Sequence, residues 1–116
     1  MTRERFTRLV EEALERLPAR FRTRIENLAV VIEDYPPEQR AAAKEEDLLM
    51  GVFEGVPATE RSVWDTAAGP NRIVLYQKNI EAVCETKDEI REEVRLTVLH
   101  ELGHYFGMDE EQLEDV

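Results

Sequence analysis

The feature that most constrains this chain is an amphipathic segment near its C-terminal end, over residues 86–105. It begins with Thr86-Lys87-Asp88-Glu89, a capping-box pattern in which the hydroxyl and the second carboxylate each bind an N–H group that the first helical turn leaves unpaired. Apolar side chains then recur at steps of four and three residues: Ile90, Val94, Val98, Leu102 and Tyr105. This spacing predicts one long helix with a single buried face. Gly107 follows where a left-handed C-terminal cap is expected.

The rest of the chain offers helices and strands that could cover this face. Near the N-terminus, one stripe with a 3.6-residue repeat predicts a helix: Phe6, Leu9, Val10, Ala13, Leu14 and Leu17. Pro18 ends that helix and can open a second, shorter one over residues 19–26. Three short apolar runs predict strands at residues 28–32, 48–53 and 73–76. The alanines at 41–43 could form a helical turn.

These elements predict an α+β fold with two layers, in which a small mixed sheet of about three strands packs on the long helix. The 116 residues, of which 42% are hydrophobic, are enough for one core. We therefore expect residues 1–116 to form a single domain. The connection over residues 54–71 is unusually long for a compact domain. Its one tryptophan, Trp64, either lines a binding cleft or pins the loop to the core.

Charge narrows the classes of function. The net charge is −11, and because residues 1–26 carry seven Arg against five Glu, a balance of +2, residues 27–116 carry −13. This acidic surface argues against nucleic-acid binding and favours a basic peptide or partner protein. We interpret the N-terminal charges as a solvated helix face with Glu–Arg pairs at helical spacing. No run is long and apolar enough for a membrane span or a signal peptide, so we expect a cytoplasmic protein.

The chemistry lies near the end of the long helix. His100-Glu101-Leu102-Gly103-His104 has the form H-E-x-x-H, and these are the only two histidines in the chain. Four residues advance a helix by about 400°, so the two imidazoles lie one above the other and can bind one Zn²⁺. Glu101 is offset by about 100° and can take a proton from a water molecule that the metal activates. The pattern predicts a zinc hydrolase.

A catalytic zinc site needs a third protein ligand, which must be a carboxylate because no third histidine exists. The tail after Gly107 offers five carboxylates. Asp109 is placed as the N-cap of a short final helix, with Gln112 completing a capping box. Glu110 then projects from the first turn. We favour Glu110 as the third ligand and keep Asp109 as the alternative.

The segment from His100 to Glu110 resembles the extended H-E-x-x-H-x-x-G-x-x-[H/D] pattern of zincins. The chain is most similar to the bacterial minimal zincins, or zincin-like metallopeptidases. The similarity extends to residues 26–34, 51–57 and 90–94. The resemblance implies a few strands packed on the active-site helix, with zinc in the cleft. It also implies that His100 and His104 are ligands, Glu101 is the base and Glu110 occupies the third-ligand position, where zincins more often carry His or Asp.

Two other functions compete with a zinc peptidase that acts on a peptide or protein substrate. One is a non-catalytic metal-binding or protein-interaction module on the same frame. The other is a purely structural zinc domain, which we disfavour because such sites usually use cysteine. Cys84 lies about 16 residues before His100, and we expect a buried free thiol. In the peptidase, Tyr76 and Tyr105 are candidate donors to the oxyanion.

Overall fold

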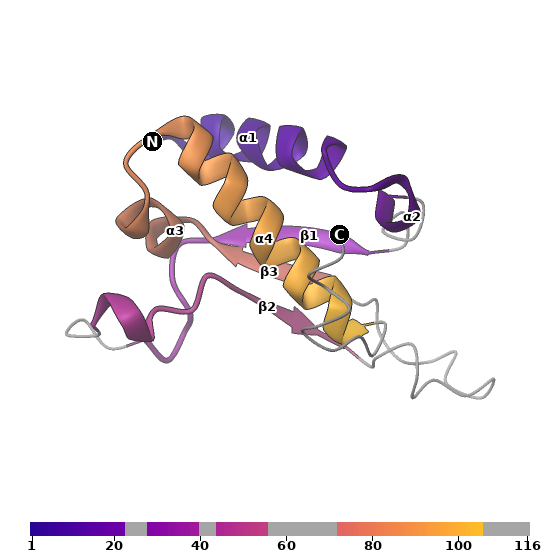
Figure 1. Ribbon diagram of the computed structural model, residues 1–116. Coiled ribbons are helices and arrows are strands. Elements are labelled where there is room, and N and C mark those ends of the chain that lie inside the picture. The colour runs from indigo at the N-terminus through magenta and orange to yellow at the C-terminus, as the bar shows by residue number, and fades with distance from the viewer. Residues whose placement is uncertain (23–27, 40–43, 56–71, 106–116) are drawn as a thin grey trace.

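The computed structural model describes residues 1–22, 28–39, 44–55 and 72–105, apart from the side chains of residues 20, 45 and 105. Within these residues the chain forms a mixed three-stranded sheet with helices, an α+β fold as the sequence predicts (Figure 1). The elements run in the order α1 (Arg3–Glu15), α2 (Ala19–Arg22), β1 (Ala29–Glu33), η2 (Glu45–Asp47), β2 (Gly51–Glu54), β3 (Arg72–Tyr76), α3 (Gln77–Val83) and α4 (Lys87–Tyr105), where η2 is a short 3-10 helix.

The three strands lie in the order β1-β3-β2, so that the last strand in the sequence is central. β1 runs parallel to β3, with Val31 opposite Val74. β2 runs antiparallel to β3, with Val52 opposite Val74. Because side chains alternate between the faces of a strand, one face of the sheet carries Val30, Ile32, Gly51, Phe53, Ile73 and Leu75.

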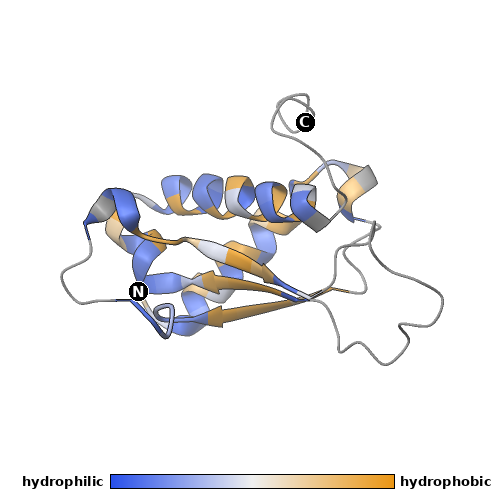
Figure 2. Ribbon diagram, turned by 90° about the horizontal axis from the view of Figure 1, so that it is seen from below, coloured by the Kyte–Doolittle hydropathy of each residue, from blue (hydrophilic) through white to orange (hydrophobic). Residues whose placement is uncertain are grey.

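Helices α1 and α4 lie on the same side of this sheet (Figure 1). α4 packs against α1, β2 and β3. The core between these layers consists of buried apolar side chains from α1, β3, α3 and α4: Phe6, Leu9, Val10, Ala13, Ile73, Leu75, Ile80, Ile90, Val94, Val98 and Leu102. Coloured by hydropathy, the strands are largely apolar, whereas the helices alternate between polar and apolar residues (Figure 2). Both predicted amphipathic faces are therefore confirmed.

The charged residues of α1 form their ion pairs with other elements. Arg3 binds Asp34 at 2.5 Å, and Glu12 binds Arg91 of α4 at 2.6 Å. No Glu–Arg pair within α1 occurs among the described residues. The prediction of Glu–Arg pairs within this helix is therefore wrong for α1, whereas the expected exposure of its charged face is confirmed.

Most predicted strand boundaries lie within one residue of the observed ones, and the larger differences concern the start of β2 and helix α3. The second strand begins at Gly51, three residues later than the apolar run suggests, because Leu48–Met50 precede it as irregular chain. Helix α3 was not predicted at all. Gln77 and Asn79 are buried there beside Ile80, so polar residues on the inner side conceal the apolar repeat. The predictions for residues 41–43, Trp64 and Gly107 lie outside the described residues.

Two amide side chains explain how α3 is held. Asn79 exchanges hydrogen bonds with the amide of Gln39 at 2.6 and 3.0 Å, and its Nδ2 also donates to the Leu49 carbonyl at 2.8 Å. These bonds fix the chain that leads into β2.

No helix in the described parts of the chain is long and apolar enough to cross a membrane.

Candidate metal centre

Helix α4 positions the H-E-x-x-H residues, and its N-terminus is fixed by the predicted cap. The Thr86 hydroxyl accepts a hydrogen bond from the Glu89 amide at 3.1 Å and donates to the Glu89 carboxylate at 3.3 Å. The second Glu89 oxygen accepts from the Glu85 amide at 3.4 Å. Since the face carrying Val94 and Val98 is fully buried, the rotation of α4 about its axis is set by the core.

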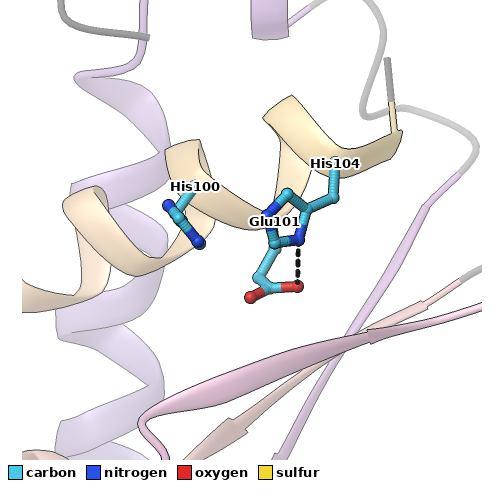
Figure 3. A group of neighbouring side chains, drawn as sticks. All are labelled: His100, Glu101 and His104. Atoms are coloured by element: carbon cyan, nitrogen blue, oxygen red, sulfur yellow. Dashed lines mark ion pairs between the residues drawn. The ribbon is translucent and has the colours of Figure 1, made fainter. Parts of the chain in front are cut away.

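That rotation brings His100, Glu101 and His104 together at the C-terminal part of α4 (Figure 3). Their potential ligand atoms all lie within 4.8 Å of one another. The centroids of the two imidazole rings are 4.5 Å apart. His104 Nδ1 lies 3.7 Å from Glu101 Oε2, and the His104 side chain is 54% exposed. The predicted spacing on one helix therefore gives a compact group that is open to solvent.

Glu101 is the least exposed of the three, at 9%. Its Oε2 accepts a hydrogen bond of 2.8 Å from the backbone N–H of Phe53 in β2. Tyr76 N donates to Met50 O, so residues 50 and 76 are a hydrogen-bonded pair of the antiparallel ladder. Hydrogen-bonded and non-hydrogen-bonded pairs alternate along such a ladder, and the pair Phe53–Ile73 is therefore non-hydrogen-bonded. The Phe53 N–H consequently points away from β3. The carboxylate is thus anchored on the side of β2 that faces away from β3.

The close approach of α4 to β2 depends on Gly51. A Cβ atom at this position would lie 2.8 Å from Thr97 Cγ2 and 2.9 Å from the Val74 carbonyl oxygen. Any larger residue would push the helix and the strand apart. Gly51 therefore brings α4 within reach of the Phe53 amide, two residues along the strand.

An open groove adjoins the triad on the side toward the start of α4. It has a volume of about 270 Å³ and is lined by Leu49, Met50, Gly51, Glu93, Leu96, Thr97, His100 and Glu101. Leu49 and Leu96 are 47% and 49% exposed, which is high for leucine. The groove thus ends at His100 and Glu101 of the triad, and a largely apolar pocket with a few convergent polar groups is a typical ligand-binding site.

Comparisons with known proteins identify the family to which this fold and site belong. The family model of the zincin-like metallopeptidases matches residues 25–116. The chain belongs to the zincin-like metallopeptidase family. Among solved structures, it is similar to a conserved hypothetical protein from Thermus thermophilus, with 26% sequence identity and a TM-score of 0.58 over 91% of this chain and 94% of that one. A search of curated proteins found no significant match.

The described residues of this zincin-like chain fit a metal ion. Imidazole nitrogens bind zinc at about 2.0–2.1 Å, so one ion can join nitrogens up to about 4 Å apart. The separations in the triad, all within 4.8 Å, are close to this limit, and the His104 side chain is exposed. The predicted third ligand Glu110 and its alternative Asp109 lie outside the described residues.

Of the two tyrosines predicted as candidate oxyanion donors, the structure describes the side chain of Tyr76 but not that of Tyr105. Tyr76 lies at the far end of β3 from Phe53, and strand alternation places its side chain on the sheet face opposite α4. There, burial raises the pKa of the Tyr76 phenol, and Glu33 and Glu54 on the same face raise it further. Tyr76 therefore does not face the triad. The side chain of Tyr105 lies outside the described part.

Cys84 at the end of α3 is a free thiol, as expected, but it is half-buried rather than buried. Burial raises its pKa to about 11, with further contributions from Glu93 and Glu89. A thiol with this pKa is neutral at physiological pH, and only thiolates bind metals well.

Three features of the site were not identified from the sequence: the Phe53 amide, the close approach at Gly51 and the position of Glu93 in the groove. A glycine inside an apolar strand run is a recognised sign of close backbone approach, so Gly51 could have been found. The other two depend on which elements pack together.

Proposed function

We propose that this protein is a zinc-dependent peptidase that hydrolyses peptide bonds with Glu101 as the general base. The observation that carries this proposal is the grouping of His100, Glu101 and His104 within 4.8 Å at the end of an apolar groove. Membership of the zincin-like metallopeptidase family supports the same conclusion.

In this proposal His100 and His104 hold the zinc through neutral imidazole nitrogens. Glu110 is the proposed third ligand, with Asp109 as the alternative. When bound, zinc would supply Lewis-acid polarisation of the scissile carbonyl and lower the pKa of water. The donor set of two nitrogens and one carboxylate oxygen leaves an open coordination position, which is typical of catalytic rather than structural zinc sites.

The two carboxylate oxygens of Glu101 have different roles in this proposal. Oε2 is held by the Phe53 N–H at 2.8 Å, which fixes the plane of the carboxylate. Oε1 has no hydrogen bond to any described residue, so we assign to it the acceptance of a proton from the attacking water and its return to the leaving amine.

The test is cleavage of a peptide library by the full-length chain, followed by mass spectrometry. We expect no cleavage after chelation, cleavage after zinc is restored, and one zinc per chain by elemental analysis. The His104→Ala variant changes an exposed side chain and should fold normally but bind no zinc and cleave nothing. Zinc binding without cleavage of any peptide would contradict the proposal and favour a non-catalytic metal-binding module.

A further inference from the structure

The groove beside the triad combines an apolar floor with one carboxylate at its far end. Glu93, Thr97 and His100 recur at steps of four and three along α4, so they lie on one face of the helix. Leu96 flanks this face, and Leu49, Met50 and Gly51 form the opposite wall. The groove therefore runs along α4 from Glu93 to the histidines.

Glu93 is half-buried in this groove. Its carboxylate forms no hydrogen bond or ion pair with any described residue. The neighbouring acidic residues of α4 behave differently: Glu92 pairs with Arg95 at 2.6 Å, and Asp88 pairs with Arg91 at 2.6 Å. A partly buried carboxylate that no described side chain pairs with is available to a cation in the groove, because partial removal from water strengthens such a pair.

The wall opposite Glu93 is held in place. The Leu49 carbonyl accepts a hydrogen bond from Asn79 at 2.8 Å, and the Met50 carbonyl accepts one from the Tyr76 amide at 2.9 Å. Gly51 adds no side chain between Met50 and the triad. The apolar surface is thus preformed, which lowers the entropy that a ligand loses on binding.

On this basis, and resting on the proposed peptidase function, we propose that the groove binds a lysine or arginine side chain next to the scissile bond of the substrate. Both side chains place an aliphatic stem before the charge, and such stems cover apolar surface while the head group reaches a polar partner. The stem would lie over Leu96 and Met50, and the cation would pair with Glu93.

The dimensions agree with this occupant. Glu93 and His100 are seven residues apart on α4, a rise of about 10 Å at 1.5 Å per residue. An extended lysine side chain has five bonds from Cα to Nζ and spans about 6 Å, on the scale of a backbone that advances 3.3–3.6 Å per three bonds. The remaining distance of about 4 Å places the substrate Cα beside the triad. The overall net charge of −11 also favours a basic substrate.

The experiment uses the full-length chain with and without zinc and three pentapeptides, Ala-Ala-X-Ala-Ala, in which X is lysine, norleucine or glutamate. Norleucine keeps the stem of lysine but lacks its charge. Binding is followed by the NMR shifts of the Gly51 and Thr97 amides, and hydrolysis is measured separately. We expect the lysine peptide to bind about five- to tenfold more tightly than the norleucine peptide, as for a partly exposed charged pair.

In Glu93→Gln this preference should disappear, and in Glu93→Lys the glutamate peptide should bind best. Glu11→Lys is the matched control, because it makes the same change of charge at an exposed position on α1, and it should keep the preference for lysine. Equal binding of the lysine and norleucine peptides, or no shift at Gly51 and Thr97, overturns the inference. Lysine-selective binding without hydrolysis of any peptide would instead contradict only the proposed peptidase.

Discussion

At position 101 a carboxylate lies between a strand amide on one side and two histidines on the other. The sequence alone predicts the second contact, because the geometry of a helix fixes how residues four apart are placed. It does not predict the first, since Phe53 is 48 residues away and joins the site only through the packing of α4 on β2. Local spacing was therefore sufficient to predict the grouping of His100, Glu101 and His104, but not the hydrogen bond that orients the Glu101 carboxylate.

The identity of the proposed third zinc ligand, Glu110 or Asp109, also depends on single residues. We expect Glu110→Ala to lower zinc affinity by orders of magnitude, because it removes the proposed third ligand, while leaving α4 unchanged. Asp109→Ala should instead cost about 0.5–2 kcal/mol of local helix stability through loss of an N-cap, with a smaller effect on zinc. Titration calorimetry with zinc measures both variants. If Asp109→Ala abolishes binding and Glu110→Ala does not, Asp109 is the ligand.

Among the elements, α4 was the most predictable, because its cap and its buried face are both encoded within the helix itself. β2 was less so, and its start was placed three residues early because an apolar run does not show where the pairing with β3 begins. Helix α3 was missed because the buried amides of Gln77 and Asn79 replace apolar residues in its inner face. Periodicity fails wherever hydrogen-bonded polar groups occupy the core.

The contact between α4 and β2 can be tested at Gly51. We expect Gly51→Ala to reduce the free energy of unfolding by about 1–3 kcal/mol, the usual effect of overpacking, because the new methyl would lie 2.8 Å from Thr97 Cγ2 and 2.9 Å from a backbone oxygen. Urea denaturation measures the change. Adding Thr97→Ser should restore part of the loss, with Thr97→Ser alone as the control. A Gly51→Ala variant as stable as the wild type would show that the contact is loose.

For the whole molecule, the layer arrangement could be predicted, because two amphipathic helices and three apolar runs have few ways to bury their faces. A mixed sheet was expected, but the strand order β1-β3-β2 and the identity of the antiparallel strand were not, since they depend on pairing between distant segments. This order places β2 at an edge beside the end of α4, with the triad, the apolar groove and Glu93 along one line. The candidate site thus combines a motif that is local in the sequence, H-E-x-x-H, with contacts that only the strand order provides.

The most direct test of the proposed zinc peptidase is the rate of peptide hydrolysis by the wild type and by Glu101→Gln at equal zinc occupancy. The glutamine can still accept the Phe53 N–H, so the fold and the metal should be retained, but it cannot take a proton. We predict a loss of at least about 100-fold, the lower end of the effect of a general base. Hydrolysis by Glu101→Gln within a few-fold of the wild-type rate would contradict the role assigned to this residue and the mechanism built on it.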